Sequence, residues 1–218
     1  MAPTPGEVKA VIWDFGGVFT TSPFDAFNRY EAERGLPTDV IRRINTVNPD
    51  TNAWARLERS ELTAEAFDAA FAAEALVLGY DIPGRDVLAR LSGDLRPRVV
   101  AAFQQCKAKF RVGCITNNAP TGKGAGMAST SEKAQAVAAV FAQFEHVIES
   151  SKAGVRKPDP RIYQMMCEAL EVAPEHCVYL DDLGINLKPA RDMGMATIKV
   201  TSEQQLLDDL SKAVGIDW

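Results

Sequence analysis

Acidic, hydroxyl and basic side chains stand where apolar runs of this sequence end. Asp14 closes the first run, and Thr116 follows the second. Asp181 and Asp182 follow a later run, and Lys157 precedes a helical pattern. Carboxylates gathered in one place repel each other unless a cation lies between them, and hard oxygen ligands suit Mg²⁺. A single aspartate after a strand more often forms a turn or caps a helix, so the prediction of a metal site rests on the whole set.

The same set contains hydrogen-bond donors for a phosphoryl group. The Thr116 hydroxyl, the Asn117 amide and the Lys157 ammonium group can all donate to phosphoryl oxygens. Asp14 held beside Mg²⁺ could attack phosphorus in line and form an aspartyl phosphate. These residue types therefore predict a phosphoryl-transfer site that takes a small phosphorylated substrate.

For these residues to meet, the elements that carry them must share one edge of a sheet. Apolar runs typical of buried strands occupy residues 8–13, 111–115, 145–148, 177–180 and 195–200. Helical patterns lie between them, at about 131–141, 160–170 and 186–193. Strands that alternate with helices indicate an α/β fold with a doubly wound parallel sheet, and ligands bind beyond the carboxyl ends of such strands.

Residues 21–95 show a different pattern, because they contain no convincing strand. Phe24 and Phe27 share one face of an expected helix, and Phe67 and Phe71 are also at helical spacing. We interpret these aromatic residues as core packing rather than as a stacking platform. The pattern predicts a small all-helical domain over residues 21–95, inserted into a core formed by residues 1–20 and 96–218.

Composition limits the partners and the compartment. The chain has 218 residues, a net charge of −5 and an isoelectric point near 5.2. An acidic balance without a basic run argues against nucleic acid or a membrane surface as a partner. The first nine residues lack a signal-peptide pattern, no apolar run could span a bilayer, and the four cysteines show no paired spacing. We therefore expect a cytoplasmic protein, either a monomer or a homodimer.

Four segments, taken in order, resemble the four motifs of the haloacid dehalogenase superfamily. They are residues 11–18 (VIWDFGGV), 115–118 (ITNN), 156–163 (RKPDPRIY) and 179–186 (YLDDLGIN). The likeness spans nearly the whole chain, and four motifs in order on matching strands make it specific. Residues 149–154 and 182–190 are similar to the phosphatase domain at the N-terminus of soluble epoxide hydrolases and to related stand-alone bacterial phosphatases.

The resemblance implies a hydrolase with a Rossmann-like core and Mg²⁺ as its cofactor. Asp14 would be the nucleophile and a metal ligand, and Gly16 would offer its backbone carbonyl to the metal. Asp182 would be the main remaining ligand, with Asp181 beside it in a supporting position of the metal site.

The resemblance also assigns the substrate-binding residues. Thr116 and Asn117 would hold the phosphoryl group, and Lys157 would neutralise its charge, so that Asp14, Thr116 and Lys157 form the catalytic set. The inserted residues 21–95 would be a mobile helical cap that closes over the site and selects the substrate.

The sequence departs from the family pattern at Gly16. Phosphatases of this superfamily usually have a second aspartate at that position, which protonates the leaving oxygen and later activates water. A positioned acid or base contributes about 10²–10⁴-fold to such a step. Three interpretations follow: a phosphatase for substrates with good leaving groups, which we favour; a 2-haloacid dehalogenase-type carbon–halogen hydrolase, which needs no such acid; or a phosphate-binding protein without turnover.

Overall fold

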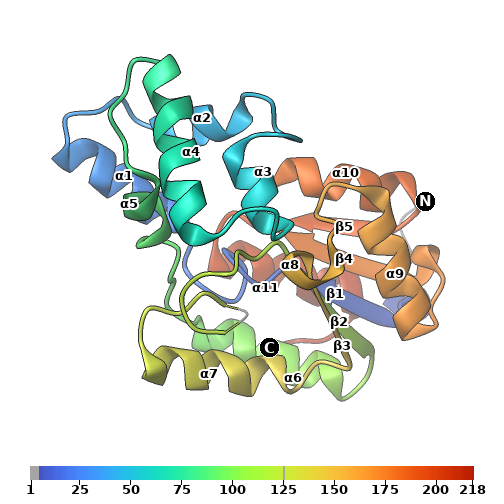
Figure 1. Cartoon of the computed structure of the whole chain (residues 1–218). Coiled ribbons are helices and arrows are strands. Elements are labelled where there is room, and N and C mark those ends of the chain that lie inside the picture. Colours follow the sequence, from blue (N-terminus) through green and yellow to red (C-terminus); the bar gives the residue numbers. More distant parts are fainter. Residues whose placement is uncertain (1–4, 125) are drawn as a thin grey trace.

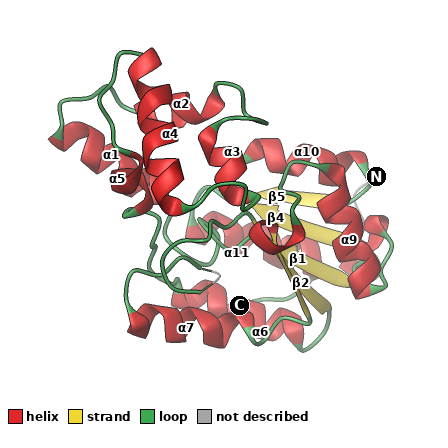
Figure 2. Ribbon diagram, in the orientation of Figure 1, coloured by secondary structure: helices red, strands yellow, loops and turns green. Residues whose placement is uncertain are grey.

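The computed structural model describes residues 5–124 and 126–218, so residues 1–4 of the expected core and residue 125 lie outside it. A sheet with helices on both faces forms one part of the described chain, and a separate group of helices stands to one side of it (Figures 1 and 2). In the two described ranges, no helix is both long and apolar enough to cross a bilayer.

Five strands form the sheet: β1 (Ala10–Trp13), β2 (Arg111–Thr116), β3 (His146–Glu149), β4 (Cys177–Asp181) and β5 (Ala196–Lys199). They are all parallel and lie in the order β3-β2-β1-β4-β5. β1 is central, and the order reverses there, so the chain winds outward in both directions. The predicted α/β fold with a doubly wound parallel sheet is therefore confirmed.

The two faces of the sheet pack against two separate apolar cores. In β1, Val11 and Trp13 belong to one core, and Ala10 and Ile12 belong to the other, as the two-residue period of a strand requires. The first core is covered by α6 (Pro97–Lys107), α7 (Ser131–Phe141) and α11 (Glu203–Val214), and the second by α9 (Pro160–Leu170) and α10 (Gly184–Asp192). Burial on both faces explains why the strand sequences are almost continuously apolar.

Five helices between β1 and α6 have an apolar core of their own, and we call them the helical unit. They are α1 (Pro23–Glu33), α2 (Val40–Thr46), α3 (Ala53–Glu58), α4 (Ala64–Val77) and α5 (Gly84–Leu88). Phe67 and Phe71 are fully buried in this core, and the Phe67 ring packs edge-on against Trp54 at a centroid distance of 5.8 Å. The aromatic residues of the unit are thus packing residues.

The two connections between the helical unit and the sheet run side by side. Thr20 and Leu95 form an isolated antiparallel bridge. Thr21 N donates to Asp94 O at 2.9 Å, and Arg96 N donates to Phe19 O at 2.8 Å. The chain therefore leaves the sheet and returns to it at one place.

Local signals explain several element ends. Asp159 caps α9 by accepting a hydrogen bond from Arg161 N, and Pro160 occupies the first turn, where no N–H is needed. Gly194 has a φ of 102°, which suits the end of α10. The remaining short elements are η1 (Pro5–Glu7), α8 (Ser150–Ala153) and η2 (Pro174–His176).

Several bounds differ from those predicted. The first strand begins at Ala10 rather than at residue 8, and the helix predicted from residue 186 begins at Gly184. Helices α6 and α11 are additional to the predicted ones. The hydrophobic pattern locates buried residues, but backbone hydrogen bonding decides where an element begins and ends, which explains these shifts.

Candidate active site

Three neighbouring strands bring the predicted acidic and hydroxyl residues to one edge of the sheet. Asp14 directly follows β1, Thr116 is the last residue of β2, and Asp181 is the last residue of β4. Because β1 pairs in parallel with both β2 and β4, these three ends lie together. Ligand oxygens of Asp14, Asp181 and Asp182 all lie within 4.8 Å of one another.

Lys157 places its ammonium group between two of these carboxylates. Its Nζ lies 2.9 Å from Asp14 Oδ1 and 2.7 Å from Asp181 Oδ2, and its side chain is only 1% exposed. Burial alone would lower the pKa of Lys157, but the charges of Asp14 and Asp181 outweigh it and raise that pKa above its usual value. Lys157 is therefore a permanent buried cation.

Asp14 is buried and remains poorly compensated despite that cation. Its Oδ1 accepts a hydrogen bond from Phe15 N at 2.6 Å as well as the contact with Lys157. Burial raises the pKa of Asp14 well above its usual value; Lys157 opposes this, while Asp181 and Asp182 add to it. The site therefore holds more carboxylate than one lysine can balance.

Asp181 is fully buried and is held by donors of the protein itself. Its oxygens accept hydrogen bonds from Leu183 N at 2.8 Å, from Asn186 Nδ2 at 3.0 and 3.1 Å, and from the Tyr179 hydroxyl. Together with Lys157, these donors occupy both carboxylate oxygens. Asp181 is thus held by the protein on both oxygens and contacts Lys157 Nζ.

Asp182 has a more open environment than its neighbour. It is partly exposed, and burial together with the charge of Asp181 raises its pKa to about 7. Gly17, with a φ of 73°, lies so close that a Cβ atom at this position would overlap Asp182 Oδ2. Gly16 differs from Gly17, because no atom lies within 4 Å of a Cβ built there. The turn after Asp14 therefore needs one glycine for space and has room at the other.

The donor set fits a divalent cation. Oxygen ligands from three acids converge, while Lys157 supplies the only ammonium group that contacts them in the described chain. Mg²⁺ prefers carboxylate and carbonyl oxygens, and a cation between Asp14 and Asp182 would relieve the repulsion that raises their pKa values.

Asn117 uses its side chain to join two segments of the site. Its Oδ1 accepts a hydrogen bond from Lys157 N at 2.9 Å, and its Nδ2 donates to Lys157 O at 3.0 Å. Thr116 beside it is buried, with 4% of its surface exposed. The Asn117 amide therefore fixes the backbone of Lys157, a contact that the sequence does not reveal.

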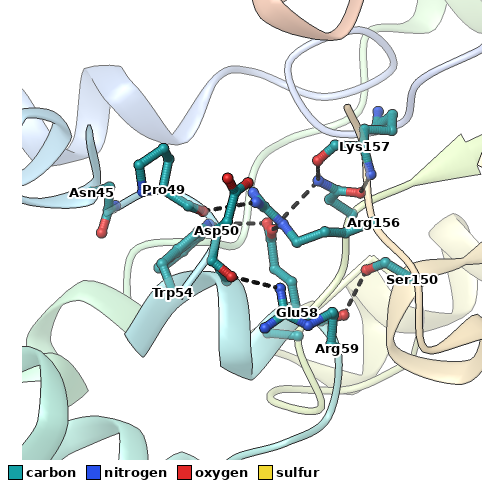
Figure 3. Close-up of polar contacts among 12 residues, drawn as sticks. Asn45, Pro49, Asp50, Trp54, Glu58, Arg59, Ser150, Arg156 and Lys157 are labelled. Atoms are coloured by element: carbon teal, nitrogen blue, oxygen red, sulfur yellow. Dashed lines mark hydrogen bonds and ion pairs between the residues drawn. The ribbon is translucent and has the colours of Figure 1, made fainter. Parts of the chain in front are cut away.

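Glu58, the last residue of α3, reaches this site from the helical unit. Its Oε2 accepts hydrogen bonds from Arg156 Nε and, at 3.3 Å, from Asn117 Nδ2. Its Oε1 accepts from Trp54 Nε1 at 2.9 Å. Figure 3 shows Glu58 and Arg156 pointing toward each other, beside Lys157. Burial raises the pKa of Glu58, and the Arg156 charge opposes that rise.

Comparison with known proteins identifies the family of this chain. The family model of the haloacid dehalogenase-like hydrolases matches residues 8–194. The chain therefore belongs to the haloacid dehalogenase-like hydrolases, and it is a hydrolase enzyme.

Among curated relatives, the chain is 30% identical over 213 residues to mouse acyl-CoA dehydrogenase family member 10, covering 95% of this chain and 19% of that protein. It is 38% identical over 120 residues to pig bifunctional epoxide hydrolase 2, covering 55% of this chain and 21% of the relative. Phosphatase MT3486 from Mycobacterium tuberculosis is 30% identical over 219 residues, covering 93% of this chain and 91% of that protein. The chain thus spans about a fifth of the first two relatives and nearly all of the third.

Solved structures share the fold at lower identity. A haloacid dehalogenase family enzyme from Bacteroides thetaiotaomicron, in complex with magnesium and inorganic phosphate, is 16% identical with a TM-score of 0.59, covering 90% of this chain and 96% of that chain. A second solved structure is the L-2-haloacid dehalogenase from Xanthobacter autotrophicus with covalently bound chloropropionic acid. It is 22% identical with a TM-score of 0.58, covering 93% of this chain and 82% of that chain. A complex with magnesium and phosphate and a covalent dehalogenase complex thus both occur on this fold.

Proposed function

We propose that this hydrolase is a Mg²⁺-dependent phosphatase that cleaves a small phosphorylated metabolite through an aspartyl phosphate on Asp14. The observation that carries the proposal is the set of three convergent carboxylates around the buried Lys157. A phosphatase relative that matches over nearly its whole length supports the same reaction. Asp14, Asp182 and the backbone carbonyl of Gly16 would hold Mg²⁺, with Asp181 in support, and the metal would supply positive charge beside the phosphoryl oxygens.

Each residue of the site would have a separate role in the reaction. Asp14 would attack phosphorus, so that an O–P bond to its carboxylate forms while the ester O–P bond breaks; water then hydrolyses the acyl phosphate. Asp14 Oδ1 is held by Phe15 N and Lys157, so Oδ2 is the oxygen better placed to attack. Lys157 would neutralise the phosphoryl charge, and the Thr116 hydroxyl would hold the group in line. The Asn117 side-chain amide is bonded to the Lys157 backbone and to Glu58, so Asn117 would act by positioning Lys157.

Gly16 limits the substrates that this site can turn over quickly. The position supplies no carboxyl group to protonate a departing oxygen, so substrates that leave without a proton are favoured. Sugar 1-phosphates, acyl phosphates and aryl phosphates have such leaving groups. The helical unit would act as the cap that selects among them, because it reaches the site through Glu58.

A carbon–halogen hydrolase is the second candidate, and Gly16 is the observation that favours it. Halide leaves carbon without a proton, so Asp14 could displace it with no acid at position 16. The acidic pair weighs against this reaction, because Asp181 and Asp182 provide metal-site carboxylates that halide displacement does not require.

Hydrolysis of p-nitrophenyl phosphate tests the proposal. We expect turnover that requires Mg²⁺ and that falls at least about 10³-fold in Asp14→Asn, because the nucleophile is lost. Asp209→Asn, which removes an exposed carboxyl of α11, is the control and should keep wild-type activity. Chloride release from 2-chloropropionate without phosphate release would favour the second candidate. Mg²⁺-dependent phosphate binding without turnover on any substrate would indicate a binding protein.

A further inference from the structure

Glu58 is the acid through which the helical unit contacts the phosphoryl-binding segments. It is 5% exposed, although it ends a helix whose buried residues Ala53 and Leu57 belong to the unit's own core. Its Oε1 accepts from Trp54 within the unit, but its Oε2 meets Arg156 and Asn117, which lie 98 and 59 residues further along the chain. A buried carboxylate in this position indicates a specific contact, because burying an unpaired charge is strongly unfavourable.

Both partners of Glu58 adjoin residues of the proposed catalytic set. Arg156 directly precedes Lys157, and Asn117 directly follows Thr116. Asn117 also bonds the Lys157 backbone through both of its amide atoms. Glu58, Arg156 and Asn117 therefore form one junction, in which movement of Glu58 would be transmitted to the backbone that carries Lys157.

Other contacts seat the same part of the unit on the sheet without involving that carboxylate. The Ser150 hydroxyl donates to Glu58 O at 2.8 Å, and the Ser60 hydroxyl donates to Ser151 O at 2.7 Å. Seating of the unit and alignment of the site are thus carried by different atoms, so a change in the Glu58 side chain can separate them.

We infer that Glu58 is a positioning residue for the phosphoryl-transfer step, which aligns Asn117 and Lys157 only when the helical unit is seated. This inference rests on the proposed function and deepens it. With the unit seated, the Glu58 carboxylate pairs with Arg156 and accepts from Asn117. With the unit displaced, Arg156 loses its carboxylate, and the Asn117 amide keeps only its contacts with Lys157. The chemical step is thereby coupled to the position of the unit.

The test compares Glu58→Gln with Glu61→Gln on p-nitrophenyl phosphate with Mg²⁺. Glu61 is the matched control, because it pairs with Arg59 inside the helical unit. We expect Glu58→Gln to lower kcat about 10- to 100-fold with KM changed by less than about threefold, since a small misplacement of catalytic groups has effects of this size. Glu61→Gln should match the wild type. Equal kcat values in both variants, or a change confined to KM, would overturn the inference.

Two further measurements separate positioning from general instability. In a double-mutant cycle, Arg156→Gln added to Glu58→Gln should lower kcat by less than the product of the single effects, because both act through one junction; a fully multiplicative loss contradicts the inference. Glu58→Asp, which keeps the charge but shortens the side chain, replaces Glu58→Gln if that variant does not fold, and it should also lower kcat.

Hydrogen exchange distinguishes failure of the inference from failure of the proposed function. If the wild type shows no phosphate release, the proposed function fails, but Glu58→Gln should still speed amide exchange at residues 116–118 and 156–157, whereas Glu61→Gln should not. Unchanged exchange at these residues in Glu58→Gln would reject the junction itself.

Discussion

The carboxyl ends of strands β1, β2 and β4, which we call the sheet edge, and the helical unit contribute to the site in opposite ways. At the sheet edge, charged groups lie close together and hold one another, as with Lys157 between Asp14 and Asp181. The helical unit is apolar at its centre, around Phe67 and Phe71, and its acid Glu58 reaches the site. Under the proposed function, the sheet edge would fix the chemistry, whereas the helical unit would control when the catalytic groups are aligned.

Among the substitutions that test this difference, removal of Lys157 should have the largest effect on activity. We expect Lys157→Met to lower kcat about 10³-fold, because the cation near the phosphoryl group is lost and two buried carboxylates lose their partner. Lys152→Met is a suitable control, since Lys152 is exposed and pairs with Glu149. Steady-state kinetics on p-nitrophenyl phosphate checks this. A loss below tenfold would show that the sheet edge does not depend on its buried cation.

The pH dependence of Mg²⁺ binding should show the next largest effect. Burial raises the pKa of Asp182 to about 7, so a proton competes with the metal below that pH. We expect the Mg²⁺ affinity to fall about 100-fold from pH 8 to pH 5, as titration calorimetry can measure. The free energy of unfolding should change with pH in the opposite direction when no metal is bound. The raised pKa of Asp182 then favours the folded state at low pH, and this stabilisation is lost as the pH rises from about 4 to about 7. An affinity that does not change with pH would remove Asp182 from the metal site.

Gly16→Asp should have a smaller effect, and it should raise activity rather than lower it. A side chain fits at position 16, because no atom lies within 4 Å of the added Cβ. The new carboxyl group would protonate poor leaving groups, so we expect about a tenfold gain on an alkyl phosphate relative to p-nitrophenyl phosphate. Gly6→Asp, which is also unobstructed, is the control. A loss of activity on both substrates would mean that position 16 tolerates no second acid.

The smallest effect on activity is expected from repacking each apolar core. Phe71→Leu in the helical unit and Phe103→Leu in the sheet core both alter fully buried rings. Each should cost about 1–2 kcal/mol of unfolding free energy and lower the Tm by a few degrees, while kcat stays within about twofold. A large loss of kcat in Phe71→Leu alone would show that the packing of the unit, and not only Glu58, controls the chemistry.

The sequence predicts the sheet edge far better than the junction. Asp14, Thr116 and the acidic pair each end an apolar strand, and a parallel sheet must bring such ends together. Lys157 is recognisable from its motif. These residues were predictable because one local pattern sets both their position and their neighbours.

Other functional contacts depend on tertiary structure. Glu58 meets Arg156 only because the helical unit folds back on the sheet, and no pattern near position 58 marks that contact. Tyr179 had a usable signal, since it lies two residues before Asp181 on the same face of β4. The Leu and Val spacing of α11 was likewise present in the sequence, at Leu206, Leu207, Leu210 and Val214.

The paired connections at Thr20 and Leu95 have a consequence for protein engineering. Because the chain leaves and re-enters the sheet at one bridge, the segment between these residues has two adjacent attachment points on the sheet. A helical segment from a relative could be grafted there without altering the strand order. Such a graft would have to carry an acid at the position of Glu58, so that the recipient's Arg156 and Asn117 find their partner.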